Sequence, residues 1–241
     1  MGTGRSRIAL FTATLLLSAA LTGCGSDDDN SSSQTQSAAE PDLAGLPELI
    51  GKEQKLYASS SRVTDANWKI VLEGFLEGYH IRATHPESFF PYGFDNLNVI
   101  EQIGPHSRVT FPFRRIEKLA AVPPQERRVL GFVTFVYHLF PNVLVTVLSN
   151  HTSLLVLEPL GVDRTQVFAY SVTNRGGDPA EALEAATRDA HFAETGASED
   201  RAMVSAIQRG VRSDANQSFV FGRFESAIVH FHRTLGAALS Q

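Results

Sequence analysis

Two histidines and a glutamate lie close together in the segment Glu77-Gly78-Tyr79-His80-Ile81-Arg82-Ala83-Thr84-His85-Pro86. Imidazole nitrogens are ligands for iron, zinc, copper and nickel, so two of them beside a carboxylate indicate a transition-metal site. On a regular α-helix, at ~100° per residue, two side chains five positions apart point about 140° away from each other. His80 and His85 can therefore reach one metal only if the helix ends or bulges between them.

Pro86 gives a reason for the helix to end there. The residue before a proline avoids the α region, so His85 is expected just beyond the helix, folded back beside His80. Glu77 lies one turn before His80 and can contact it, and the ordinary alternative is a salt bridge from Glu77 to Lys69 or Arg82. Taken alone, His-x4-His is a weak signal, and two partly exposed histidines are its ordinary alternative.

The element that must position these histidines is a helix beginning near Trp68, with Asp65 or Asn67 as its N-cap. Its apolar residues recur at the spacing of one buried helical face, namely Trp68, Val71, Leu72, Phe75 and Tyr79. After a loop at Pro91, a block rich in β-branched and aromatic residues follows, and turn residues divide it into strands.

Seven strands are predicted in all, at residues 55–63, 99–103, 108–113, 129–137, 143–148, 153–157 and 166–172. Short connections such as residues 149–151 favour antiparallel hairpins. An Ala- and Glu-rich helix is expected from Pro179, a second helix from a Ser198 cap to about Val211, and a last amphipathic helix over residues 224–239. The pattern predicts an α+β domain.

Several separated motifs occur in one order along the chain. These are Asn67-Trp68-Lys69 leading into Glu77-x2-His80-x4-His85, then residues 138–142 (HLFPN), Glu199-Asp200 before residues 208–210 (QRG), and residues 222–225 (GRFE) with residues 230–233 (HFHR). Over about residues 46–239 they make the chain resemble the catalytic domain of the Rieske-type non-haem iron ring-hydroxylating oxygenases. Motifs in series are far more specific than any one of them.

The resemblance implies a helix-grip (Bet v 1/START-like) domain, an antiparallel sheet around a long C-terminal helix. It also implies a mononuclear Fe(II) held by His80, His85 and Asp200, the two-histidine, one-carboxylate set that leaves positions open for O2 and substrate. In the family, a carboxylate at the position of Glu77 links the iron-site histidine to a Rieske-cluster histidine on a neighbouring subunit, which makes Glu77 a catalytic candidate and a homotrimer an expectation.

Asp200 is also favoured by its place in the sequence. In a helix after Ser198 it lies three and four residues before Met203 and Val204, which belong to the apolar face, so it tips toward that face. A carboxylate there is costly unless paired or metal-bound. The ordinary alternative is an Asp favoured at a helix start, and Glu199 is the competing ligand. His138 and His230 lie in apolar stretches and are expected to be hydrogen-bonded core histidines.

Cys24 is the only cysteine. Family members carry Cys-x-His and Cys-x2-His motifs for a [2Fe–2S] cluster, and this chain has neither, so it cannot build a Rieske cluster of its own. Cys24 instead ends Leu21-Thr22-Gly23-Cys24, behind Arg5, Arg7 and a short apolar run. This leader resembles the lipobox of bacterial lipoproteins, in which the cysteine is acylated.

Three parts are therefore expected: a lipoprotein signal peptide at residues 1–23, a polar tether at residues 24–40, and the catalytic-type domain at residues 41–241. The tether has too few apolar residues for their burial to offset the entropy lost on ordering the segment, and its run Asp27-Asp28-Asp29 is expected to be solvated charge. The expected location is the cell envelope, with the domain anchored to a membrane through the lipid.

The charge balance is mildly acidic, with 21 Lys and Arg against 26 Asp and Glu, and no basic stripe appears, which argues against nucleic acid as a partner. Three interpretations remain open, one of which is a lipoprotein leader fused to a truncated oxygenase that has no activity. The other two are functions. One is an oxygenase, hydroxylating or oxidatively demethylating a small aromatic or amine substrate with O2, that draws electrons from a separate Rieske ferredoxin and reductase. The other is a lipid-anchored, catalytically degenerate protein that binds a small apolar ligand.

Overall fold

The computed structural model describes residue 46 and residues 54–174, 177–213, 215 and 218–240, all of which belong to one unit, Glu40–Gln241. Cys24, the signal peptide and the tether lie outside the described residues. None of the described helices is both long and apolar enough to cross a bilayer.

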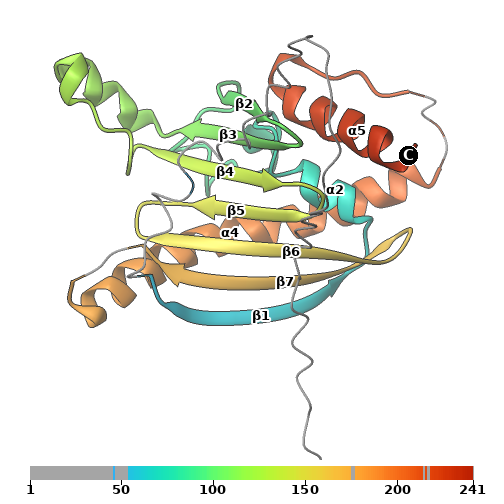
Figure 1. The fold of residues 1–241 in the computed structure, drawn as a ribbon, viewed down its shortest axis with the longest axis horizontal. Helices are drawn as coiled ribbons and strands as arrows, with labels where there is room; N and C mark the ends of the chain where they lie inside the picture. Colours follow the sequence, from blue (N-terminus) through green and yellow to red (C-terminus); the bar gives the residue numbers. More distant parts are fainter. Residues whose placement is uncertain (1–45, 47–53, 175–176, 214, 216–217, 241) are drawn as a thin grey trace, which may run out of the picture. The chain divides into compact units, whose positions relative to one another are not determined.

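Seven antiparallel strands form one sheet in the order β1-β7-β6-β5-β4-β3-β2 (Figure 1). Their bounds are β1 Leu56–Thr64, β2 Val99–Ile103, β3 His106–Pro112, β4 Val133–Leu139, β5 Val143–Val147, β6 His151–Gly161 and β7 Arg164–Thr173. All seven predicted strands are confirmed, with shifted ends. Apart from the first strand, which pairs with β7, each strand from β2 to β6 pairs with the next along the chain. Short turns join these pairs, except that residues 113–132, with two short 3-10 helices, join β3 to β4.

The first helical segment is shorter than its apolar spacing predicts. Helix α2 spans only Trp68–Glu73, capped by the Asn67 side chain, which accepts a hydrogen bond from the Lys69 backbone N–H at 3.0 Å. It ends at Gly74, and the chain becomes helical again in α3, His80–Thr84. The prediction of one face running through Tyr79 is wrong, since Tyr79 lies in the break and is 41% exposed.

Two predicted helices are one. Helix α4 runs without interruption over Pro179–Val211, with Asp178 as its N-cap. Ser198 caps nothing, because its hydroxyl donates to the carbonyl of Thr195 within the same helix at 2.7 Å. The long helix of the helix-grip arrangement is thus α4, which crosses behind the sheet in Figure 1, and the C-terminal α5, Ser226–Leu239, is shorter.

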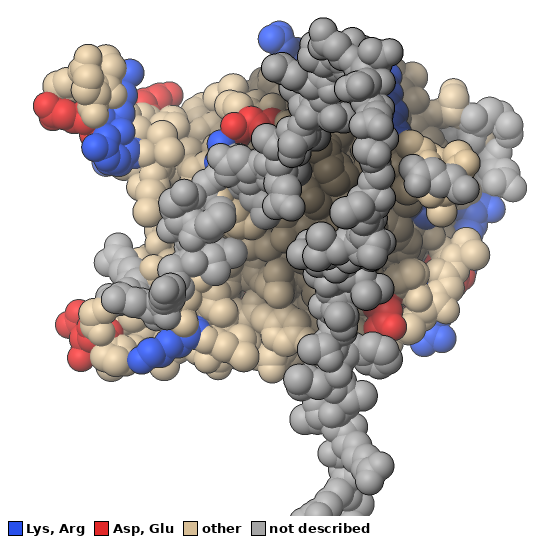
Figure 2. All heavy atoms as spheres, in the orientation of Figure 1, with Lys and Arg blue, Asp and Glu red and all other residues tan. Residues whose placement is uncertain are grey.

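Apolar side chains gather on both faces of the sheet. Alternate residues of β4 divide between two apolar clusters, Val136 packing with Phe231 of α5 on one side and Phe135 and Tyr137 on the other. Helix α4 contacts β1, β6 and β7, while α5 contacts β2 and β3. On the face in Figure 2, the charged side chains that can be seen are of both signs and lie mainly at the margins.

Candidate metal centre and active site

The two histidines are brought together by the end of α3. His80 opens this helix and His85 is its C-cap, with φ −120° and ψ 44°, outside the α region as Pro86 requires. The His85 backbone N–H still donates to the carbonyl of Ile81 at 3.0 Å, so one turn separates the rings. Their centroids lie 5.2 Å apart, and the predicted helix end between the two side chains is confirmed.

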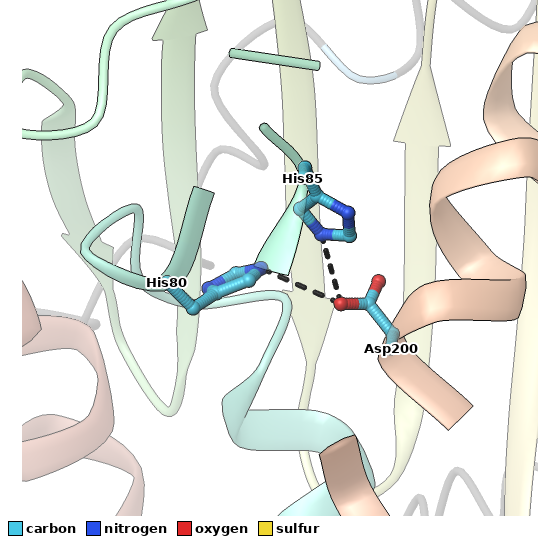
Figure 3. A group of neighbouring side chains, drawn as sticks. All are labelled: His80, His85 and Asp200. Atoms are coloured by element: carbon cyan, nitrogen blue, oxygen red, sulfur yellow. Dashed lines mark ion pairs between the residues drawn. The ribbon is translucent and has the colours of Figure 1, made fainter. Parts of the chain in front are cut away.

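Asp200 reaches the same point from α4 (Figure 3). Its Oδ1 lies 2.9 Å from Nε2 of His85 and 3.6 Å from Nε2 of His80. One ligand atom from each residue lies within 4.8 Å of the others, and this is the metal-capable group among the described residues. Because α4 continues through residue 198, Asp200 is not at a helix start, and the dipole cannot account for it.

His85 Nε2 offers an independent sign of a missing ligand. The atom is buried and makes no hydrogen bond of acceptable geometry among the described residues, although Asp200 lies nearby. Buried polar atoms are rarely left without a partner. A lone pair held in this way, next to a second imidazole and a carboxylate, fits a metal such as Fe(II), for which this donor set is typical.

Each histidine is held from behind by its own carboxylate. The Nδ1 atom of His80 is hydrogen-bonded to Glu77, which also accepts from the His80 backbone N–H at 3.3 Å. The Nδ1 atom of His85 lies 2.7 Å from Glu199, which accepts a second bond from the Ser88 hydroxyl at 2.6 Å. Both arrangements leave Nε2 for a metal, as in carboxylate–histidine–metal triads.

Each of the two glutamates thus pairs with one histidine in the structure. Lys69 bonds the Asn67 side chain and Arg82 stacks over Phe90, so Glu77 pairs with His80 and not with either cation. Glu199 is turned to the far side of His85, where it orients the ring. Only its position next to Asp200 pointed to this role, since neighbouring helical residues point about 100° apart and can contact opposite edges of one ring.

A close approach between α4 and the loop after His85 completes the wall behind that histidine. The Phe89 ring stacks on His85 with centroids 4.7 Å apart. Phe89 in turn lies against Gly196 of α4, where any Cβ would overlap the ring. The buried glycine is thus required by packing, and no sequence motif singles it out.

The two carboxylates beside His85 shift its pKa. Burial alone lowers the pKa of His85, but the negative charges of Asp200 and Glu199 next to the ring outweigh it, and the pKa is raised above 6.5. The bond from His85, with that from Ser88, lowers the pKa of Glu199. In the metal-free protein the two carboxylates thus favour the protonated ring, and a proton at Nε2 competes with a metal for that atom.

Metal binding should consequently weaken as the pH falls. Above the raised pKa of His85 the ring is neutral and Nε2 is free, whereas below it the proton competes with the metal. The stability of the metal-free protein changes with pH in the opposite direction. The raised pKa of His85 stabilises the fold below pH 6.5, and this contribution is lost as the pH rises through the pKa of the folded state. Thermal unfolding with and without Fe(II) should show a metal-induced stabilisation at pH 8 that shrinks towards pH 6.

The remaining core histidines take no part in the centre. His138 is fully buried, and its Nε2 donates to the carbonyl of Pro141 at 3.0 Å. Burial lowers the pKa of His138 to about 4, so it stays neutral. The expectation of hydrogen-bonded core histidines is only half met, because Nδ1 of His138 and Nε2 of His230 are buried without a partner among the described residues.

A cavity of about 240 Å³ opens beside the centre. His80, Asp200 and Glu77 form one part of its lining, and an apolar wall comes from α2, α4 and α5. The wall residues are Ile70, Val71, Phe75, Met203, Val204, Ile207 and Ile228. The apolar face of α4 predicted after Ser198 thus lines a cavity, which explains why Met203 and Ile207 are 41% and 45% exposed.

Solved structures with this fold are numerous. The chain matches the quaternary ammonium Rieske monooxygenase CntA bound to an inhibitor with a TM-score of 0.60 and 18% identity, covering 79% of this chain and 51% of that one. It matches naphthalene 1,2-dioxygenase from Rhodococcus sp. bound to indole with a TM-score of 0.55 and 14% identity, covering 78% and 57%. The chain thus spans about half the length of these proteins.

Among curated protein sequences none matches the chain. The family model described as ring hydroxylating alpha subunit (catalytic domain) matches residues 52–241, which include His80, His85 and Asp200. This match takes in nearly all of the described residues, and the shared fold agrees with it. The chain therefore belongs to the family of ring-hydroxylating alpha subunits and carries their catalytic domain.

Proposed function

We propose that this chain is the catalytic domain of a mononuclear non-haem iron oxygenase that hydroxylates or oxidatively demethylates a small aromatic or amine substrate. The observation that carries the proposal is the convergence of His80, His85 and Asp200 at the edge of an apolar cavity. Fe(II) held by these three residues would supply open coordination positions for O2 and substrate.

The protein's own side chains have distinct tasks in this account. Glu77 and Glu199 hold the Nδ1 protons of the two histidines, which fixes the rings with Nε2 toward Asp200. The apolar wall excludes water from the space beside the centre and positions an apolar part of the substrate there. Glu77 also lines the cavity, where it contacts the iron-site histidine His80.

Electrons are proposed to come from a separate Rieske ferredoxin and its reductase. The 241 residues contain a single cysteine, and a Rieske cluster takes two cysteines and two histidines. Glu77, hydrogen-bonded to His80, is the proposed link toward a donor docked on a neighbouring subunit, as in a homotrimer.

Turnover tests this function. Reduced nicotinamide and a reductase alone should give no oxygenation, because no relay lies near the iron, whereas adding a Rieske ferredoxin, or supplying peroxide, should restore it. Glu77→Gln should slow the ferredoxin-driven reaction more than the peroxide-driven one, since only the former needs the link. Product formation would be followed by mass spectrometry with labelled oxygen.

Activity with reductase alone would refute the proposed electron route. Absence of turnover under every condition, with tight binding of an apolar ligand in the cavity, would favour the alternative of a catalytically degenerate binding protein. In that case the three ligands would remain as a vestige of the family's chemistry.

We also propose that Cys24 is acylated and anchors the domain in the cell envelope. The lipobox-like tetrad that ends at Cys24 supports this. Cys24→Ser should release the mature domain from membranes or leave an uncleaved precursor, because the acyl chains are the anchor. Fractionation of cells expressing either form, followed by intact mass, checks the result; a Ser variant in the membrane fraction at the mature size would contradict it.

A further inference from the structure

The cavity beside the metal centre contains more charge than its apolar wall suggests. Besides the centre itself, its lining includes Arg62 of β1, Glu73 of α2, Arg201 of α4 and Glu225 near the start of α5. Charged groups brought into a partly enclosed space are costly unless they are paired. The partners of each group therefore indicate what charge the cavity would accept from a ligand.

The acidic groups are all engaged. Glu73 pairs with His232 at 2.8 Å, and Glu225 accepts from the Gly222 backbone N–H. Glu77 holds His80, and Asp200 faces the two histidines. None of these carboxylates is left free to attract a cationic substrate.

Arg201 is engaged as well, since its Nη2 lies 2.7 Å from a carboxylate oxygen of Glu194. Arg62 differs. Its Nε atom is buried without a hydrogen-bond partner, and no ion pair joins its guanidinium to an acidic group among the described residues. Of the charged side chains that line the cavity, Arg62 alone lacks a partner within the described part of the chain.

The backbone of Arg62 is firmly placed. It lies in β1 opposite Val167 of β7, and its carbonyl accepts a hydrogen bond from the Gln166 side chain at 3.0 Å. Burial and the positive charge of Arg201 lower the pKa of Arg62, and Glu194 opposes them only in part. A guanidinium nevertheless remains charged in proteins, so the cavity holds a fixed cation whose Nε atom lacks a hydrogen-bond partner among the described residues.

We propose that Arg62 binds the carboxylate of the substrate, which is a small molecule with an apolar body and one carboxylate group. The guanidinium presents parallel N–H donors that match a carboxylate in a two-bond geometry. The apolar body would lie along the wall formed by α2 and α4, with its reacting carbon toward His80 and Asp200. This substrate class rests on the proposed function, because it places the reaction at the three-residue centre.

The size of the cavity agrees with a small substrate. Ligand pockets usually measure about 300–1,000 Å³, and this one is smaller. A single aromatic ring or a short chain with one carboxylate is the scale of ligand that fits such a space. The carboxylate then narrows the class of aromatic and amine substrates to those that also carry an anion.

Calorimetric titration of the iron-loaded protein without oxygen tests the proposal, with benzoate and phenylacetate as probes and their neutral amides as matched controls. The acids should bind at least tenfold more tightly than the amides. Arg62→Gln should remove about a tenfold to hundredfold share of the acids' affinity, the usual effect of losing a charge-assisted bond, and leave the amides unchanged. Arg62→Lys should fall between. Arg188→Gln, on an exposed arginine of α4, is the control.

Two further arms separate this inference from the metal centre. Arg62→Gln should keep its iron and its melting temperature. Asp200→Ala, which should lose the iron, should still prefer the acids through Arg62. Equal affinity for acids and amides, no measurable binding of either acid, or acid binding that Asp200→Ala abolishes and Arg62→Gln does not alter would each overturn the proposal. Absence of iron from the wild type would overturn the proposed function but leave the role of Arg62 testable.

Discussion

Asp200→Ala should reduce iron binding from about one Fe(II) per chain to almost none, because it removes the carboxylate that, among the described residues, faces both imidazole Nε2 atoms. His80→Ala and His85→Ala should do the same. The fold should survive the loss of Asp200, since this side chain is one-third exposed and lies at the cavity. Metal analysis after anaerobic reconstitution and gel filtration gives the stoichiometry.

Glu199→Gln, the neighbouring position, should behave differently. It keeps a group that can contact Nδ1 of His85 but removes the charge, so iron should still bind, with affinity reduced about 10- to 100-fold as for other groups that orient a metal ligand. Glu184→Gln, an exposed carboxylate of α4, should have no effect. Full loss of iron in Glu199→Gln with retention in Asp200→Ala would reverse the assignment of the third ligand.

Gly196→Ala is expected to destabilise the domain, although alanine is the better helix former. The added methyl must push Phe89 away from α4, and Phe89 stacks on His85. Overpacking of this kind usually costs about 1–3 kcal/mol. Iron affinity should fall with it, because His85 loses the ring that supports it.

Gly210→Ala provides the matched control on the same helix. Nothing lies within 4 Å of a Cβ placed there, so this substitution should stabilise the domain by roughly 0.5–1 kcal/mol. Urea unfolding followed by circular dichroism measures both changes. Combining Gly196→Ala with Phe89→Ala should largely remove the clash; equal losses from Gly196→Ala in both backgrounds would show that Phe89 is not the cause.

Much of this fold could be predicted from the sequence, because the strands rely on signals that are local. Segments such as Val99–Ile103 and Val143–Val147 are dense in β-branched residues and end at turns, and the short loops leave only antiparallel pairing. The helix boundaries were harder to predict from the sequence. Ser198 is a good N-cap by residue type, but in the structure its hydroxyl bonds within α4, and only the packing of that helix on the sheet decides between the two.

The three-residue centre could be predicted from the sequence for a different reason. His80, His85 and Pro86 form a local motif whose geometry follows from backbone preference, and Asp200 stands in a second motif of the family. The groups around this centre could not be predicted from the sequence. Glu199 holds His85 across more than a hundred residues of chain, and Arg62 reaches the cavity from a strand that no motif marks. Such partners depend on tertiary packing.

The most direct test of the central claim is a crystal of the wild-type protein soaked with Fe(II) without oxygen and measured on both sides of the iron absorption edge. The account predicts one anomalous peak, bonded to Nε2 of His80, Nε2 of His85 and the carboxylate of Asp200, with Glu77 and Glu199 on the far nitrogens. No peak at this position, or a peak held by other residues, would contradict it.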